Sequence, residues 1–411
     1  MERVKINNNV NLYIDKTNKF KSVNVDVVFS TLLSDKDKVY YYALSAFLED
    51  SCAKYDTKQK VSNVLDELYG AKLNVKIDKK GEALLIRFTS SLINDKYVKQ
   101  DLLSKQFALL NEFINHPIFE DDIKARKLFN EVKEILVLNI NTINDDPISY
   151  ASNKANELFG DMLANKAIYS QEDVNKLSFE HLKQIYDQMI KKMAVDIFVL
   201  GDVDKEEIKK LALQYFNYPS RDTTKSLVHL SHREDHLYLV EDKKLKQANI
   251  VLLYECGIGS YDDDYAAMII ANGMLGVLPT SLLFSVIREK YSYCYSIYSS
   301  YKIYDGIIKI ATSCNKENIE KIKELINEQI DIIRNNKFDD NLLNDTKNMY
   351  ISNYRLADDS ISNIMWSNYR ESVVNDQRTT EKIIEDFLKV SRDDVARVMN
   401  KLVLKVDFEL I

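Results

Sequence analysis

The chain has 411 residues, a formal net charge of −7 and 45% hydrophobic residues, with only 4 prolines and 9 glycines. That length exceeds one ordinary core and predicts roughly two to three domains of about 150 residues each, in an ordered, helix-rich globular protein. The negative charge argues against nucleic acid or an anionic membrane as the main partner.

The first half of the chain alternates between the period of a strand and the period of a helix. Gly70 is placed to end a helix, as a C-terminal glycine cap does, and Pro147 redirects the chain. In chain order, these patterns predict a hairpin over Val4–Asp15, a strand over Ser22–Thr31, helices over Tyr40–Cys52 and Lys58–Tyr69, strands over Leu73–Ile77 and Ala83–Ser90, helices over Asp101–Asn115, Asp121–Asn141, Ser149–Phe159 and Ser178–Lys191, a strand over Ala194–Leu200 and a helix over Glu206–Phe216.

A polar stretch without a clear period separates the two halves, which predicts a linker. We expect an N-terminal domain over 1–220, a linker over 221–235 and a C-terminal domain over 236–411. His229, His232 and His236 lie in or beside this linker with Glu234. Their order matches neither H-x-x-E-H nor H-E-x-x-H, so we interpret the stretch as a solvated linker and not as a metal site.

The second half repeats the order of elements found in the first. This is a two-fold repeat at a period of roughly 220 residues, which indicates duplicated domains and not a solenoid, whose periods are about 20–50 residues. The predicted elements are strands over Leu237–Val240 and Ala248–Glu255, helices over Asp262–Met274 and Leu282–Lys290, strands over Cys294–Ser300 and Ile307–Ser313, and helices over Lys316–Asn335 and Asn341–Ala357.

The helix predicted over Tyr40–Cys52 carries one pattern with chemical meaning. Ala46, Glu49 and Asp50 stand at i, i+3 and i+4, which puts them on one helical face. That is the spacing of H-x-x-E-H, in which two histidines hold zinc and the glutamate activates water. Both histidine positions are filled by other residues here, so an ordinary helix with an acidic face is the better explanation of the segment when it is taken alone.

Duplicated α+β halves, this degenerate motif and an Arg–Tyr pair in the second half together resemble the pitrilysin-type family of inverse-motif zinc peptidases. The resemblance implies two homologous domains, each a mixed β-sheet with helices mainly on one face, that form a clam-shell chamber. The family's third ligand is a glutamate before an Asp-x-Pro turn, and that position is Asn139 here. The resemblance therefore implies that Ala46, Asp50 and Asn139 replace all three metal ligands, while Glu49 is retained.

The segment Leu282–Ser296 resembles the family's Leu-Phe-x-x-x-Arg-Glu-Lys-x-Gly-Leu-x-Tyr-Ser. Arg288 and Tyr295 occupy the Arg and Tyr positions, and the family's glycine is Ser292 or Tyr291 here. In the family this pair reaches the substrate backbone near the zinc. A guanidinium and a phenol are suitable donors to a carbonyl or an oxyanion, so the resemblance implies that Arg288 and Tyr295 bind substrate.

The resemblance further implies a subunit that holds no zinc and cleaves no peptide alone. It would bind a peptide or unfolded protein and complete the active site of a paralogous peptidase with an intact H-x-x-E-H, so zinc is expected only in that partner. Two alternatives stay open: an active peptidase with an unusual metal site, and a purely structural scaffold that binds peptides.

The expected location is the cytoplasm. The N-terminus lacks the basic and apolar regions of a signal peptide, and no apolar run approaches the roughly 18 residues that span a bilayer. Cys52, Cys256, Cys294 and Cys314 form no C-x-x-C pair, which suits a reducing compartment.

Overall fold

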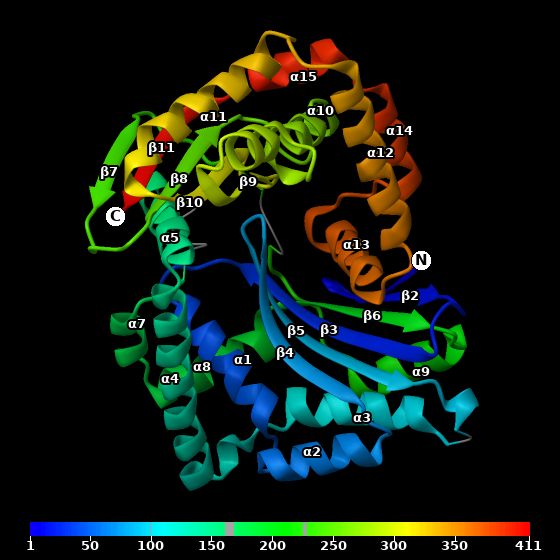
Figure 1. Ribbon diagram of the computed structural model, residues 1–411. Coiled ribbons are helices and arrows are strands. Elements are labelled where there is room, and N and C mark those ends of the chain that lie inside the picture. The colour runs from blue at the N-terminus through cyan, green and yellow to red at the C-terminus, as the bar shows by residue number, and fades with distance from the viewer. Residues whose placement is uncertain (99, 161–167, 225–227) are drawn as a thin grey trace. The chain divides into compact units, whose positions relative to one another are not determined.

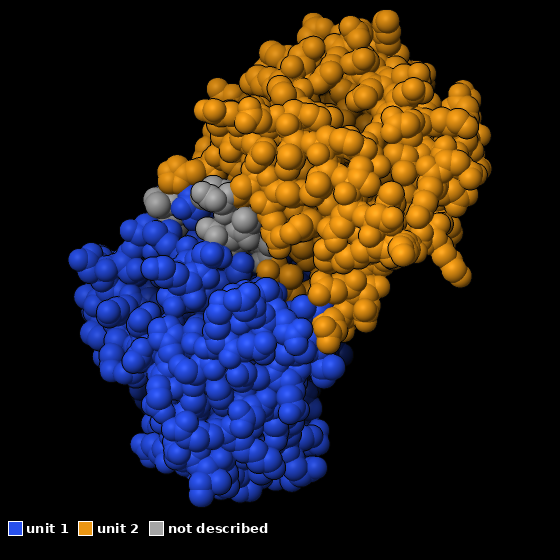
Figure 2. All heavy atoms as spheres, turned by 90° about the vertical axis from the view of Figure 1, so that its left-hand side faces the viewer, with its two compact units in different colours: residues 1–140, 169–227, 359–375 blue, residues 141–168, 228–358, 376–411 orange. Residues whose placement is uncertain are grey.

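The computed structural model describes residues 1–98, 100–160, 168–224 and 228–411. The chain forms two compact units, each with its own β-sheet (Figure 1). Unit 1 comprises residues 1–140, 169–227 and 359–375, and unit 2 comprises residues 141–168, 228–358 and 376–411 (Figure 2). Each unit is therefore built from segments of both halves of the sequence.

Unit 1 contains a six-stranded mixed sheet with the strand order β1-β2-β6-β3-β5-β4. β2 pairs with β6 in parallel, and the other neighbours are antiparallel. The predicted hairpin is confirmed, because β1 pairs with β2 across the turn at Asn9. The strands are β1 Glu2–Asn7, β2 Val10–Lys16, β3 Ser22–Leu32, β4 Lys72–Lys80, β5 Ala83–Ile93 and β6 Ala194–Gly201.

Alternation along the strands divides this sheet into an apolar and a polar face. In β3, the positions of Val23, Val25 and Val27 alternate with those of Asn24 and Asp26. Figure 1 shows α3 on one side of the sheet and α13 on the other. The helices of unit 1 are α1 Lys38–Asp50, α2 Lys58–Glu67, α3 Leu102–Asn115, α4 Asp122–Asp145, α7 Gln171–Asn175, α8 Phe179–Lys192, α9 Lys205–Tyr215 and α13 Ile361–Val374.

Unit 2 contains a five-stranded mixed sheet with the strand order β7-β11-β8-β10-β9. β7 and β11 are parallel, and the other neighbours are antiparallel. The strands are β7 Leu237–Glu241, β8 Ala248–Glu255, β9 Cys294–Lys302, β10 Ile307–Cys314 and β11 Val403–Leu410, and the helices are α5 Pro147–Phe159, α10 Tyr265–Asn272, the π-helices η3 Gly273–Val277 and η4 Phe284–Lys290, α11 Ile319–Arg334, α12 Asp340–Ala357, α14 Thr380–Lys389 and α15 Arg392–Met399.

The two sheets share one plan when they are aligned from their parallel pair. The order β2-β6-β3-β5-β4 in unit 1 corresponds to β7-β11-β8-β10-β9 in unit 2, with the same sequence of parallel and antiparallel pairings. The predicted α+β fold with two related mixed sheets is confirmed. Unit 1 has one strand more, β1, which pairs with the outer edge of β2. The closing of the two units into a clam-shell chamber stays a prediction.

Two helices pack in a different unit from the one to which the predicted domain boundaries would assign them. α5, from the N-terminal half, packs on β8 and β11 of unit 2, where Ala151, Ala155 and Phe159 join an apolar cluster. α13, from the C-terminal half, packs on β6 of unit 1, where Tyr369 contacts Phe198. Residue 220 belongs to unit 1 and residue 236 to unit 2, but helical periodicity records only that a helix has an apolar face, not which sheet that face covers.

The segment predicted as a solvated linker is attached to both units in its described residues. Arg221 is buried, and its N–H donates to the carbonyl of Asn8. Ser231 N–H donates to the carbonyl of Asp305 at 2.8 Å. His232 Nδ1 lies 2.7 Å from Glu255 Oε1. Polar composition therefore did not mean a loose chain here, because backbone groups of the segment pair with the units. Among the described residues, no helix is long and apolar enough to cross a membrane.

Candidate functional site: a degenerate ligand set and an arginine–tyrosine pair

α1 carries the degenerate motif and packs on the edge strand β4. Its apolar face is fixed by buried side chains, among them Leu44, Phe47 and Leu48, and the Phe47 ring stacks on Phe119 with centroids 4.7 Å apart. Ala46 and Glu49 lie on the partly buried side of the helix. α1 therefore carries the motif positions on a helix that packs beside the edge strand β4.

Glu49 is bound to the backbone of the edge strand. Its Oε1 accepts a hydrogen bond from the N–H of Val75 at 3.4 Å, and Ser45, one turn earlier, donates from Oγ to the carbonyl of Val75 at 2.9 Å. Burial raises the pKa of the Glu49 carboxyl, while the Val75 N–H opposes that shift and Asp50 adds to it. The retained glutamate thus has a structural partner, and Ser45 completes the contact.

The other motif positions do not fit a zinc ion. Asp50 forms an ion pair with Lys58, 2.9 Å between Oδ2 and Nζ, and Ala46 has no ligand atom. The side chain of Asn139 hydrogen bonds to the hydroxyl of Tyr169. A catalytic zinc needs three protein ligands, whereas the described residues contain no group of three His, Cys, Asp or Glu that could hold a metal.

Tyrosines lie between the two helices that carry these positions. The ring of Tyr169 packs against Tyr42 of α1, with centroids 4.9 Å apart, and its hydroxyl meets Asn139 of α4. Lys79 of β4 lies over the Tyr42 ring with Nζ 5.5 Å from the centroid. Aromatic packing therefore joins α1 to α4 beside the degenerate ligand positions. Neither Tyr42 nor Tyr169 was predicted here; only the position of Tyr42, one turn before Ala46, gave a signal.

Arg288 and Tyr295 lie together in unit 2. Arg288 belongs to η4, and its Cζ lies 4.5 Å from the ring centroid of Phe284, one turn earlier, and 5.5 Å from that of Tyr295. Its ion pair with Glu289 measures 3.6 Å between Nε and Oε1, beyond hydrogen-bond length. The guanidinium thus lies near both rings, and its one ion pair among the described residues is the long contact with Glu289.

A β-bulge presents Tyr295 to the surface. Ser313 pairs with Ser296 and Cys314 pairs with Cys294, so Tyr295 is the extra residue between two successive pairs. Bulges re-aim a side chain and occur next to functional sites. Tyr295 is 84% exposed, an unusual environment for a large aromatic side chain. The sequence gives no signal for this bulge.

The turn between the two residues keeps a left-handed backbone without glycine. Ser292 has a φ of 54°, which identifies Ser292, and not Tyr291, as the residue at the turn position. Ahead of η4, Gly276 lies so close to β9 that an added Cβ would meet the Ser299 backbone nitrogen at 2.9 Å. Close packing of this loop and the Ser292 turn together set the position of η4 against β9.

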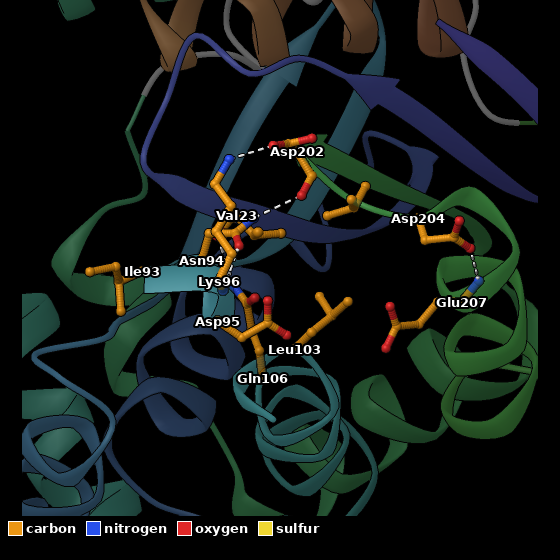
Figure 3. Close-up of a pocket in the computed structure, with 11 residues that line it drawn as sticks. Val23, Ile93, Asn94, Asp95, Lys96, Leu103, Gln106, Asp202, Asp204 and Glu207 are labelled. Atoms are coloured by element: carbon orange, nitrogen blue, oxygen red, sulfur yellow. Dashed lines mark hydrogen bonds and ion pairs between the residues drawn. The ribbon is translucent and has the colours of Figure 1, made fainter. Parts of the chain in front are cut away.

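A cavity of about 140 Å³ elsewhere in unit 1 contains none of the predicted site residues (Figure 3). Lys96 forms an ion pair with Asp202 at its rim, and burial together with neighbouring acids raises the pKa of Glu207. Gln106 Nε2 donates to the carbonyls of Val23 and Ser90 at 3.1 Å. These hydrogen bonds connect α3 to the sheet. We therefore attribute the polar lining of the cavity to the packing of α3 on the sheet.

Comparisons with known proteins agree with this geometry. Residues 176–350 match the family model described as the peptidase M16 inactive domain. The chain is 26% identical over 410 residues to the probable inactive metalloprotease YmfF of Bacillus subtilis, covering 97% of this chain and 95% of YmfF. It is 23% identical over 322 residues to the antilisterial bacteriocin subtilosin biosynthesis protein AlbE of the same species, covering 74% of this chain and 76% of AlbE.

A solved structure extends the likeness to the whole fold. A conserved protein from Enterococcus faecalis V583 superposes with a TM-score of 0.91 at 26% identity, covering 100% of this chain and 98% of that one. The full-length relative, the inactive-domain match and the replaced ligands all lead to the same assignment. These comparisons support an inactive homologue of the pitrilysin-type M16 peptidases.

Proposed function

We propose that the chain is a non-catalytic subunit that binds a peptide substrate and completes the active site of a zinc-bearing paralogue with an intact H-x-x-E-H. The observation that carries this proposal is the exposed Arg288–Tyr295 pair. Both side chains can donate to a peptide carbonyl or to the oxyanion that forms when water attacks it. The β-bulge presents Tyr295 at the surface, and the Arg288 guanidinium lies near its ring. A surface without a binding role would not require this arrangement.

The metal in this proposal belongs to the partner. Asp50 is paired with Lys58 and Glu49 is bound to Val75, so each carboxylate already has a structural partner in this chain. The two subunits therefore have different roles. The partner activates water, and this chain orients the peptide and binds the negative charge that develops on the carbonyl oxygen. Preorganised donors of this kind act without a metal ligand in their own chain.

The substrate is a peptide or unfolded protein chain. β4 is an edge strand, and an extended peptide can add to such an edge by main-chain hydrogen bonds. The name of the relative AlbE refers to biosynthesis of a bacteriocin, which favours peptide maturation as the setting. The four cysteines are buried and unpaired, and we place this work in the cytoplasm.

A binding scaffold without a part in catalysis is the second candidate, because α1 and β4 keep the architecture of a peptide site without its metal. The two candidates differ in what Arg288 and Tyr295 do. A scaffold needs no donors aimed at a reacting carbonyl, so its function would tolerate the loss of both.

The test is reconstitution. The purified chain and a paralogue with an intact motif are assayed separately and together for peptide cleavage, and zinc is measured by elemental analysis. We expect cleavage only from the mixture, with zinc in the paralogue alone. Cleavage by this chain alone, with tightly held zinc lost in Asp50→Asn and cleavage lost in Glu49→Gln, would favour the unusual active peptidase. Full activity of the paralogue alone would favour the scaffold.

A further inference from the structure

β7 is an edge strand whose apolar side chains remain at the surface. Tyr238, Leu239 and Val240 are 53%, 37% and 38% exposed. Figure 1 shows β7 at the margin of the unit 2 sheet, with β11 on one side only. Edge strands are usually shortened, charged or covered, because an uncovered apolar edge pairs with other strands. β7 is short, but its central residues carry no charge and no strand among the described residues covers their outer edge.

The corresponding strand of unit 1 is paired with a further strand at its outer edge. β2 has the position in unit 1 that β7 has in unit 2, and β1 covers its outer edge as an antiparallel strand. In unit 2 the segment before β7 does not fold back in this way. Ser231 N–H donates to the carbonyl of Asp305, and the Arg233 guanidinium donates to the carbonyl of Leu158 at 2.8 Å. Among the described residues, no strand covers the outer edge of β7.

The free hydrogen-bonding groups of this edge can be identified. The carbonyl of Glu241 accepts from Ile411 N–H at 2.9 Å, and Lys243 N–H donates to the carbonyl of Ile411 at 2.7 Å. Odd-numbered residues of β7 therefore bind β11. Because backbone groups alternate in direction along a strand, those of Tyr238 and Val240 are directed outward.

We propose that β7 pairs antiparallel with β7 of a second copy of this chain. With the two-fold axis at Leu239, Tyr238 of one copy stands opposite Val240 of the other, and the outward N–H and C=O groups of both residues are satisfied. The two five-stranded sheets then continue into one. The exposed apolar side chains meet their counterparts across the axis, which buries them on both faces of the joined sheet.

Charge at the two ends of β7 selects the second copy and the antiparallel direction. Arg233, Glu234 and Asp235 precede the strand with a net charge of −1, and Asp242, Lys243 and Lys244 follow it with a net charge of +1. Antiparallel pairing places the acidic end of one copy beside the basic end of the other, twice per dimer. Parallel pairing would place like charges together, which is destabilising. The self-complementary pattern is what a two-fold interface requires.

The strand is short, so this association is reversible and concentration-dependent. Interfaces below about 1,200 Å² belong to weak or transient contacts. The proposal does not depend on the proposed function, because Arg288 and Tyr295 are not on β7.

Sedimentation velocity of the full chain over a range of concentrations tests the proposal. We expect a monomer–dimer equilibrium that Leu239→Lys weakens at least about tenfold, since that substitution places two lysines at the axis. Val240→Pro removes an outward N–H and should weaken the dimer as well. Leu213→Lys, at a 50% exposed leucine of α9, is the matched control and should leave the equilibrium unchanged.

Charge reversal tests the register and gives the sharpest outcome. One variant carries Glu234→Lys with Asp235→Lys, and another carries Lys243→Glu with Lys244→Glu. Each alone should fail to dimerise, whereas all four substitutions on one chain should restore the dimer at low salt, because reversed charges again meet opposite charges. This rescue distinguishes pairing from a folding defect.

Hydrogen exchange supplies the second measurement. The amides of Tyr238 and Val240 should be protected only at concentrations where the dimer forms. A chain that stays monomeric at its highest soluble concentration would overturn the proposal. A dimer insensitive to Leu239→Lys and to charge reversal, or one that protects other strands instead, would overturn it equally, and so would an edge that binds only the paralogue.

Discussion

Glu49 accepts a hydrogen bond from the backbone N–H of Val75, so the one retained residue of the degenerate motif is bound to the edge strand. Ser45 binds the carbonyl of the same residue. In a zinc peptidase this glutamate activates a metal-bound water. Here the same helical position connects α1 to β4. A change of role without a change of residue explains how the glutamate can persist where the metal ligands have been replaced.

Glu49→Gln should stabilise the protein slightly at neutral pH. The amide oxygen still accepts from Val75, whereas the charge, which burial and Asp50 disfavour, is removed. Because the folded pKa of Glu49 is raised, ionisation lowers stability as the pH rises from the unfolded pKa through the folded one. Thermal unfolding at pH 4 and pH 7 checks this, with the two proteins alike at about pH 4. A Glu49→Gln protein less stable at pH 7 would contradict it.

Ser45→Ala is the companion variant for this contact. It leaves the buried carbonyl of Val75 without its hydroxyl partner, which costs about 1–3 kcal/mol. Unfolding in denaturant measures that loss. Ser104→Ala would be a poor comparison because Ser104 lies near a helix N-terminus, so the exposed Ser285 in η4 is the better control, with an effect within about 0.5 kcal/mol.

Local pattern was enough to predict most strands, most helices and the repeat, because periodicity reports which face of an element is buried. It was not enough to assign α5 to its unit, since that depends on long-range packing, and α7, α13, α14 and α15 lie outside the predicted elements. β11 lies outside the predicted elements although Val406, Phe408 and Leu410 alternate. That alternation with acidic residues is a strand signal that the prediction missed, and the structure shows that Lys323 pairs with both acids.

For the candidate site too, some features could be predicted from local pattern and others depended on long-range packing. Motif spacing placed Ala46, Glu49 and Asp50 on one helical face and brought Arg288 to Tyr295. It could not show the hydrogen bond from Val75 to Glu49, the Tyr169 contact with Asn139 or the bulge at Tyr295, because each depends on a second element remote in sequence. Spacing records which residues can meet, and packing decides which do.

Ser292→Gly should raise the stability of unit 2. Ser292 has a left-handed backbone, which costs a residue with a Cβ about 1 kcal/mol more than glycine. Part of that gain is lost to the greater freedom of glycine in the unfolded chain. We expect a rise in Tm of about 1–3 °C by calorimetry. Ser285→Gly, in the interior of η4, is the matched control and should lower the Tm.

Tyr369→Ala should detach α13 from unit 1. Tyr369 is fully buried and packs edge-on against Phe198 with centroids 4.7 Å apart. Removing a buried aromatic ring costs about 3–5 kcal/mol. Trp366, the one tryptophan of the chain, lies on the same helix beside Arg87, so its fluorescence should shift to longer wavelength.

Tyr354→Ala is the control for this prediction. Tyr354 packs against Phe387 within unit 2, so its removal should lower stability without changing the emission of Trp366 in the folded protein. An equal shift in the emission of Trp366 in both variants would mean that this fluorescence does not measure the packing of α13 on unit 1.

Arg288→Ala and Tyr295→Phe should each lower turnover of the reconstituted pair by about 10²–10³, the cost of losing one preorganised donor. Both side chains are at the surface, so folding and assembly with the paralogue should be unaffected. Peptide-cleavage kinetics and co-sedimentation measure the two effects separately. Lys290→Ala and Tyr291→Phe remove a positive charge and a phenol hydroxyl from exposed neighbours and should leave turnover unchanged. If Glu49→Gln were as damaging as Arg288→Ala, or if the neighbours mattered as much as the pair, the roles assigned to Arg288 and Tyr295 would be wrong.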